Sequence, residues 1–215
     1  MQLTIVITDY NTNLEWISEL DNSLKQLDVE FDIVRVSNNS VYKFTSTTAV
    51  TELFCEAGNV SKAKNIGLQA ATGEYVLMID NDDMLLHGNI KQYLGFDVIL
   101  PKYGSGLLKK QFNGTIIRRE LIQKYNLRFL DIDYYEDYYI VYKLYYEKTH
   151  TLTTIAKPFY YYRRNPNGIC NTSSASYKIR RLEQVKTIML SMKNINAKRV
   201  MRDIEPNIDY WKQKL

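Results

Sequence analysis

Segments with strand and helix periodicity alternate over roughly the first hundred residues, and no other feature constrains the fold as strongly. Residues 3–8 and 31–36 are rich in β-branched and apolar side chains, which is typical of buried strands. Between them, apolar residues recur three and four positions apart, which predicts a helix capped by Thr12 or Asn13. Strand–helix–strand order predicts an α/β fold with a mainly parallel sheet covered by helices.

The alternation continues to about residue 101. A helix is expected from Asn59 to Ala71, and Gly73 stands where a helix end often requires a left-handed residue. Two more strands are expected over residues 74–79 and 97–100. The later elements have weaker patterns and comprise helices over 116–125 and 136–146, one or two strands over 152–162, and one or two amphipathic helices from 174, broken by Pro206.

A polar cluster follows each of the first three predicted strands, at residues 8–11, 37–40 and 80–83. Parallel sheets bind ligands at the carboxyl ends of their strands, where these clusters would meet. The last cluster, DNDD, holds three carboxylates, which repel one another unless a cation or solvent screens them. Carboxylates suit Mg²⁺ or Mn²⁺, and these ions hold phosphate oxygens. A solvated acidic turn is the alternative interpretation of this cluster taken alone.

Four groups of motifs then follow one another along the chain. They are IVITDYN (5–11), GNVSKAKNIGL with ATGEYVLMIDNDD (58–68 and 71–83), IRREL, NLRF and YED (117–121, 126–129 and 135–137), and PFYYYR (158–163). Together they resemble the family 2 glycosyltransferases of the GT-A fold, of the bacterial polysaccharide type. The similarity runs in the family's order from residue 3 to about residue 173.

This resemblance implies a single GT-A domain over residues 1–173, with a donor-binding half (1–101) and an acceptor and catalytic half (102–173). Residues 174–215 would form a helical tail. The implied activity is metal-dependent, inverting transfer of a sugar from a nucleoside diphosphate sugar to a glycan or lipid-linked acceptor hydroxyl. A UDP-sugar is the first donor candidate, and Mn²⁺ or Mg²⁺ is the implied cofactor.

The resemblance also assigns roles to acidic residues. Asp82 and Asp80 would hold the metal ion, with Asp83 assisting. Asp137 would be the base that deprotonates the acceptor hydroxyl, and Glu136 would orient it or contact the acceptor. The alternative for Glu136 and Asp137 is a pair of acids that stabilises a helix N-terminus.

The resemblance to the family also implies which residues bind the donor. The implied donor-binding residues are Thr8, Tyr10, Asn38, Lys64, Asp80 and Asn81. Asn38 stands where the family has an aspartate that accepts a hydrogen bond from uracil, and Ser37 replaces the preceding aspartate. An amide accepts but also donates, so these substitutions put uridine specificity in question. Lys64 replaces a common arginine and keeps its charge without the planar fork; alternatively, it lines a solvated helix face with Lys62. Tyr10 would face the base, or else be a core aromatic.

Two further groups have alternative interpretations. Arg163 and Arg164 could close over the diphosphate as a loop, or they could simply end a charged strand. Tyr134 and Tyr135 precede the expected base and could form a platform for an acceptor sugar. The other tyrosines of this region that share one helical face, and are therefore expected in the core, are Tyr138, Tyr142 and Tyr145.

Composition narrows the classes of function. No apolar run approaches the roughly 20 residues that cross a bilayer, and the N-terminus lacks the features of a signal peptide. Cys55 and Cys170 are too few for a disulfide framework, so a cytoplasmic protein is expected. The net charge of +4 suits an anionic ligand.

Basic residues concentrate between Lys178 and Arg202. This tail could pack on the domain, contact anionic lipid peripherally at the inner face of the membrane, or mediate homo-oligomer formation. Two alternatives to an enzyme stay open. One is a degenerate GT-A domain that binds nucleotide or glycan without turnover, and the other is a nucleic-acid-binding domain. The first 100 residues do not call for the latter, so no nucleic-acid partner is expected.

Overall fold

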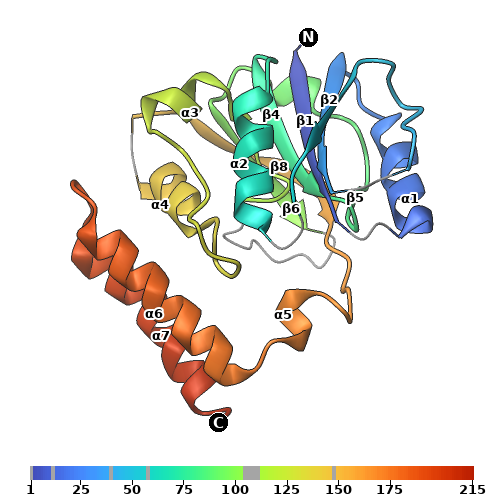
Figure 1. Ribbon diagram of the computed structural model, residues 1–215. Helices are drawn as coiled ribbons and strands as arrows, with labels where there is room; N and C mark the ends of the chain where they lie inside the picture. The colour runs from blue at the N-terminus through green and yellow to red at the C-terminus, as the bar shows by residue number, and fades with distance from the viewer. Residues whose placement is uncertain (1, 11–12, 39–40, 57–58, 104–111, 147–148) are drawn as a thin grey trace.

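The computed structural model describes residues 2–10, 13–38, 41–56, 59–103, 112–146 and 149–215 (Figure 1). Its strands are β1 Leu3–Asp9, β2 Phe31–Ser37, β3 Val50–Phe54, β4 Tyr75–Asp80, β5 Met84–Leu85, β6 Val98–Tyr103, β7 Ile116–Arg118 and β8 Leu152–Tyr161. Its helices are α1 Leu14–Leu24, α2 Val60–Ala70, a 3-10 turn Lys91–Tyr93, α3 Glu120–Lys124, α4 Tyr138–Tyr146, α5 Ile169–Thr172, α6 Ala175–Ser191 and α7 Ala197–Lys212. Outside this description lie Asn11, Thr12, Asn39, Ser40, Gly58 and the side chain of Cys170.

All the strands belong to one sheet of order β3-β2-β1-β4-β7-β6-β8-β5. The N-terminal half of the sheet is parallel, because β1 pairs in parallel with β2 and β4, and β2 pairs in parallel with β3. Beyond β4 the sheet is mixed, because β7 runs antiparallel to both β4 and β6. The predicted α/β class with a mainly parallel N-terminal sheet is therefore confirmed. The sequence patterns missed β3, a mostly exposed strand, and β5, which has two residues.

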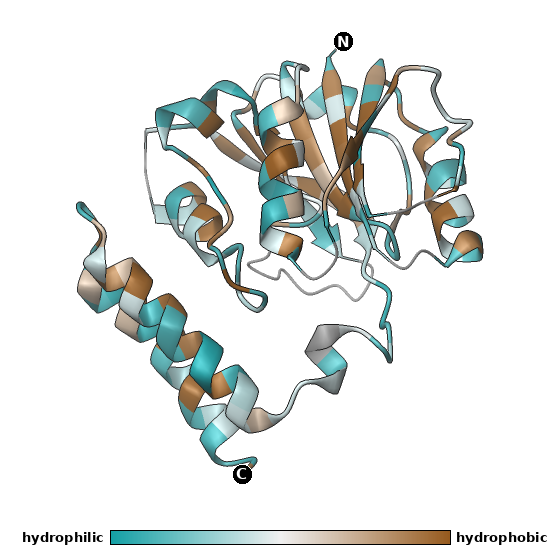
Figure 2. Cartoon of the chain, in the orientation of Figure 1, coloured by the Kyte–Doolittle hydropathy of each residue, from teal (hydrophilic) through white to brown (hydrophobic). Residues whose placement is uncertain are grey.

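Strands β1, β2 and β4 bury both of their faces, which explains their continuous apolar sequences. In β1, Ile5 and Ile7 pack in the same cluster as Leu20 of α1, whereas Val6 packs in the cluster that holds Leu68 of α2. Figure 2 shows this as hydrophobic strands at the centre and more polar outer surfaces on the helices. The side chains of Asn13 and Asn59 cap α1 and α2, as predicted.

The prediction of a helix over residues 116–125 is wrong for its first part. Ile116 and Ile117 are fully buried, and as β7 they pair with Leu77 and Val76 of β4. A short apolar segment is ambiguous by periodicity, and here pairing within the sheet decides its conformation. The short α3 follows at Glu120. The helix expected over residues 136–146 begins two residues later, and residues 152–161 form one strand.

Gly73 does not have the left-handed conformation that was predicted for it, and the helix-capping residue Ala71 is extended. A Cβ atom at Gly73 would instead lie 2.6 Å from the backbone N of Thr4 and 2.8 Å from the carbonyl carbon of Leu3. The glycine is therefore explained by the close approach of this turn to β1.

Helices α6 and α7 pack side by side at the C-terminus (Figure 1). Pro206 does not break α7, contrary to the prediction, although it removes one backbone N–H. The flanking Ile204 and Ile208 are buried in a cluster that also contains Tyr142 of α4, and this packing holds both halves of the helix in place. Within the described residues, no helix combines the length and apolar character that crossing a membrane requires.

Candidate functional site

A cleft of about 1380 Å³ opens where β1, β2 and β4 end. This is the edge at which parallel sheets bind ligands. The sequence-predicted residues that line it are Thr8, Tyr10, Asn38, Lys64, Asp80, Asn81, Asp82, Glu136 and Asp137. Arg163 and Arg164 are not among the lining residues.

Strand pairing brings the polar clusters together at the floor of the cleft. Thr8 of β1 is in register with Asp80 of β4, and Asp9 is in register with Ser37 of β2. The Thr8 hydroxyl donates to Asp80 Oδ1 over 3.3 Å, and Asn81 Nδ2 donates to Asp9 Oδ1 over 2.9 Å. Side chains about 70 positions apart therefore form one hydrogen-bonded surface.

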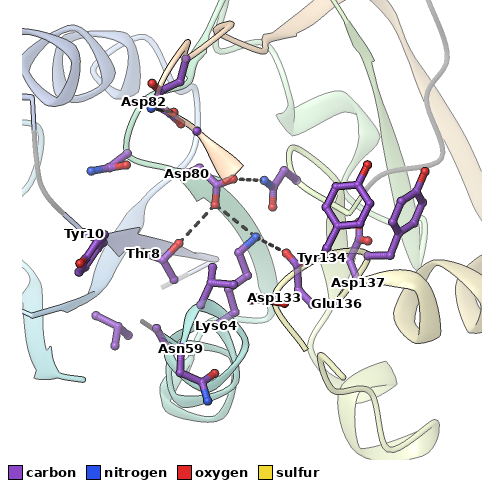
Figure 3. A pocket seen from close by; sticks show the side chains of 18 of the residues that line it. Thr8, Tyr10, Asn59, Lys64, Asp80, Asp82, Asp133, Tyr134, Glu136 and Asp137 are labelled. Carbon is purple, nitrogen blue, oxygen red and sulfur yellow. Dashed lines mark hydrogen bonds and ion pairs between the residues drawn. The ribbon is translucent and has the colours of Figure 1, made fainter. Parts of the chain in front are cut away.

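Lys64 extends from α2 between two carboxylates (Figure 3). Its ammonium lies 3.0 Å from Glu136 Oε1 and 3.4 Å from Asp80 Oδ1, and the residue is only 4% exposed. Burial alone would lower the pKa of Lys64, but the charges of Asp80 and Glu136 raise it well above its usual value. Lys64 is therefore a buried cation that joins the two sides of the cleft.

The acidic turn after β4 has the geometry of a cation site. One carboxylate oxygen from each of Asp80, Asp82 and Asp83 lies within 4.8 Å of the others. Burial and the nearby charge of Asp80 raise the pKa of Asp82. A bound cation would relieve this repulsion, so the donor set fits Mg²⁺ or Mn²⁺.

Asp83 differs from its neighbours because it faces the protein interior. Its carboxylate accepts hydrogen bonds from the Tyr160 hydroxyl over 2.5 Å and from the Arg163 backbone N–H over 2.8 Å. Burial and the charge of Asp80 raise the pKa of Asp83 to about 8. Asp83 is fully buried and does not line the cleft, so it joins the end of β8 to the acidic turn.

Asp137 lies across the cleft from this turn (Figure 3). Its Oδ2 accepts a hydrogen bond of 3.0 Å from the Phe112 backbone N–H. Burial and the charge of the adjacent Glu136 raise the pKa of Asp137 to about 6. A carboxylate with such a pKa is ionised at neutral pH and more basic than an ordinary aspartate.

Helix α2 holds the segment that carries these two acids. The Ser61 hydroxyl donates to the Ile132 carbonyl, and Asn65 exchanges hydrogen bonds of 2.8 and 3.0 Å with the Phe129 backbone. Within the segment, the Leu130 N–H donates to the Glu136 carbonyl over 2.8 Å. The polar residues of the GNVSKAKNIGL motif therefore position the segment that carries Glu136 and Asp137.

Tyrosines line the cleft beside Asp137. The rings of Tyr134 and Tyr135 pack edge to face with centroids 4.7 Å apart, and Tyr135 has the left-handed φ of 61°. Such a backbone conformation is uncommon for a residue with a side chain and concentrates at functional sites. Of the three tyrosines expected in the core, Tyr142 is buried, but Tyr138 and Tyr145 are partly exposed and line the cleft.

The opposite end of the cleft holds the positions predicted to contact a nucleobase. Tyr10 is 53% exposed, so it is not a core aromatic. Ser37 and Asn38 lie beside it in the lining, with the buried thiol of Cys55. This end offers an accessible aromatic ring next to small polar groups.

Arg163 contacts the outside of the acidic turn. Its Nε donates to the Asp82 carbonyl over 2.8 Å, and its guanidinium pairs with Glu19 and lies 5.2 Å from the Trp16 ring centroid. Arg164 is exposed. The predicted role of these arginines at a diphosphate remains a prediction.

Asn113 was not predicted from the sequence. The side-chain amide of Asn113 donates to Asp80 Oδ2, and its backbone carbonyl accepts a 2.9 Å hydrogen bond from the Tyr103 hydroxyl. The next residue, Gly114, has a φ of +80°, and a Cβ there would lie 2.5 Å from the Tyr160 ring. An Asn-Gly pair signals a turn, but this local signal does not reveal a contact with a strand 33 residues away.

No protein-family model matches the chain. The poly(ribitol-phosphate) beta-N-acetylglucosaminyltransferase TarS of Staphylococcus aureus is 29% identical over 137 residues, which cover 54% of this chain and 24% of that protein. The chain thus matches only about a quarter of the length of this relative.

Structural similarity to solved proteins covers more of the chain than sequence similarity does. The structure of S. aureus TarS residues 1–349 with UDP-GlcNAc gives a TM-score of 0.72 at 20% identity, covering 93% of this chain and 69% of that one. The chain has the GT-A glycosyltransferase fold. Mannosyltransferase PcManGT from Pyrobaculum calidifontis, in complex with GDP-Man and Mn²⁺, gives 0.65 at 16% identity, covering 98% of this chain and 69% of that one.

Proposed function

We propose that this protein is a metal-dependent, inverting glycosyltransferase of family 2. It transfers a sugar from a nucleoside diphosphate sugar to a hydroxyl of a glycan or lipid-linked acceptor. The observation that carries the proposal is that one cleft holds both the Asp80–Asp82 pair and Asp137, with Lys64 between them. Sequence similarity to TarS and the shared fold support it.

The donor end favours a nucleotide sugar. Tyr10 would stack on the base, with Thr8 and Asn38 beside the nucleoside and Asn81 near the diphosphate. Related folds hold UDP-GlcNAc in TarS and GDP-Man in PcManGT. UDP is the first candidate here because of the sequence similarity to TarS. The Asn38 amide can both donate and accept hydrogen bonds, whereas an aspartate only accepts them, so Asn38 suits a wider range of bases.

Asp82 and Asp80 would hold Mn²⁺ or Mg²⁺. When bound, the cation would neutralise the charge that develops on the leaving diphosphate. Lys64 adds a fixed positive charge on the same side of the cleft, and it stays protonated because two carboxylates surround it. Arg163 and Arg164 are proposed to contribute from the neighbouring loop.

Asp137 is proposed to take the proton from the acceptor hydroxyl. The acceptor oxygen then bonds to the anomeric carbon on the face opposite the nucleotide, and the bond from that carbon to the diphosphate oxygen breaks. The configuration inverts, the proton resides on Asp137, and the electron pair leaves with the nucleoside diphosphate. Glu136 orients this site through its ion pair with Lys64.

A binding protein without turnover is the second candidate, and the replacement of two family aspartates by Ser37 and Asn38 favours it. Thermal melts with UDP, GDP and CDP, with and without Mn²⁺, test the donor site, because ligand binding raises the melting temperature. Hydrolysis across a panel of nucleotide sugars then separates the two candidates. Metal-dependent hydrolysis supports the enzyme, and nucleotide binding without hydrolysis supports the alternative. Absence of nucleotide binding contradicts the enzyme and leaves only the glycan-binding form of the alternative.

The remaining assignments are predictions from sequence. They are a cytoplasmic location, peripheral contact of the basic tail with the membrane, and homo-oligomer formation. No nucleic-acid partner is proposed, and a steeply salt-dependent affinity for oligonucleotides would contradict this.

A further inference from the structure

The cleft continues past Asp137 to the C-terminal helices. Its lining includes Tyr138 and Tyr146 of α4 and Asp203 and Asn207 of α7. The hydroxyls of Tyr146 and Tyr138 donate to Asp203 Oδ2 over 2.6 and 3.4 Å. Helix α7 is therefore one wall of the cleft.

Contacts from α6 hold this wall against the segment that carries the catalytic acids. Arg181 contacts Asp133 through two nitrogens, at 2.6 Å for Nε to Oδ1 and 3.1 Å for Nη2 to Oδ2. The ammonium of Lys178 lies 4.0 Å from the Trp211 ring centroid and 6.0 Å from that of Tyr134. A paired arginine and a buried lysine thus fix the position of the helices relative to Glu136 and Asp137.

This extension is suited to a polyhydroxylated molecule. Phenol hydroxyls both donate and accept hydrogen bonds, the Asn207 amide does both as well, and the Asp203 carboxylate accepts. The tyrosine rings provide apolar faces between these polar groups. Sites of this composition, with aromatic walls and a few placed polar groups, bind small molecules.

The charges in the extension disfavour an anion. Lys64 is the only cation among the described lining residues, and it is paired with Glu136. Nearby arginines are paired too, Arg181 with Asp133 and Arg202 with Asp203. Arg199 is not among the lining residues, and its guanidinium lies 4.9 Å from the Tyr146 ring centroid. The charged groups that line this end are Asp133, Glu136, Asp137 and Asp203.

We infer that the extension is an acceptor subsite for a neutral, polyhydroxylated molecule, built partly by Asp203 and Asn207, and that it rejects acceptors that carry phosphate. This rests on the proposed function. A phosphate placed here would meet carboxylates and, among the described lining residues, would find no arginine or lysine without a carboxylate partner, the kind of group that phosphate binding uses. The acceptor therefore differs in charge from the polymer named for TarS.

The test measures binding of matched probes by saturation-transfer NMR, with the full chain in UDP and Mg²⁺. The pairs are glucose with glucose 6-phosphate, N-acetylglucosamine with its 6-phosphate, and ribitol with ribitol 5-phosphate. We expect a neutral member to bind at least about tenfold more tightly than its phosphate. Equal or tighter binding of the phosphates, or binding of neither member in any pair, would overturn the inference.

Asp203→Asn and Asn207→Ala should each weaken binding of the neutral probe about tenfold while UDP binding is unchanged. Asp209→Asn removes the same charge from an exposed position of the same helix and should have no effect. Neutral-probe binding that is unchanged in both cleft variants overturns the role of α7. If the unmutated chain binds none of UDP, GDP and CDP, the proposed function fails. If it binds one of these nucleotides but shows no preference for the neutral probes, only this inference fails.

Discussion

The Lys64 ammonium lies 3.0 Å from Glu136, a residue 72 positions away, and this ion pair connects helix α2 to the segment that carries Asp137. The same ammonium lies 3.4 Å from Asp80, so one buried cation balances an acid from each side. Without it, Asp80 and Glu136 would face each other in a partly buried site, where like charges repel strongly.

Lys64→Met should therefore impair both binding and turnover. We expect donor affinity and transfer rate to fall together, by about 10²-fold or more in kcat/KM, because the fixed charge and the position of Glu136 are both lost. Lys62→Met alters an exposed lysine on the same helix and is the matched control. Steady-state kinetics and isothermal titration with UDP measure both effects, and equal losses in the two variants would contradict the special role of Lys64.

Asp137→Asn should strongly reduce transfer without affecting donor binding. The amide can still accept the hydrogen bond from Phe112 but cannot take a proton, so kcat should fall by about 10² to 10⁴-fold. Asp131→Asn, an exposed change in the same segment, should retain activity. A fully active Asp137→Asn enzyme would exclude Asp137 as the base.

The pKa of Asp137, raised to about 6, predicts how activity depends on pH. Below pH 6 the carboxyl is protonated, so kcat/KM for the acceptor at saturating donor should fall about tenfold per pH unit. A profile that stays flat down to pH 5 would contradict this assignment.

The free energy of unfolding should fall as pH rises through this range, whereas activity should rise. Because the folded-state pKa of Asp137 lies above its unfolded value of 3.8, ionisation destabilises the fold progressively as pH rises from about 4 to 6, and the loss is constant at higher pH. Asp137→Asn removes this penalty and should melt at a higher temperature than the unmutated protein at pH 7. The two melting temperatures should converge near pH 4, and a lower melting temperature for the variant at pH 7 would contradict the prediction.

Asp82 and Asp83 are adjacent, but their replacement should have different consequences. Asp83→Ala leaves the buried Tyr160 hydroxyl and Arg163 N–H without their partner, so the free energy of unfolding should fall by about 1–3 kcal/mol. Asp82→Ala should instead weaken the dependence of UDP binding on Mn²⁺, with a change in stability of no more than about 0.5 kcal/mol. Urea denaturation and calorimetric titration measure the two quantities, and similar profiles for both variants would contradict the division of roles.

Local sequence patterns were sufficient for much of the N-terminal half. β1, β2 and β4 have unbroken apolar sequences because both of their faces are buried, and Asn13 and Asn59 cap the helices that follow their turns. Polar residues at the ends of these strands predicted the edge of the sheet where the cleft lies. These signals depend on neighbours within a few residues, so sequence alone determines them.

Tertiary structure decided the features that depend on distant partners. Ile116 and Ile117 form a strand because β4 and β6 flank them, and Asn113 joins the site because its turn packs against β4. Of the adjacent Asp82 and Asp83, only Asp83 accepts a hydrogen bond from Tyr160 and points into the interior. Helix α7 reaches the cleft because its apolar side packs beside α4. No local pattern encodes these outcomes, since each depends on side chains that only folding brings together.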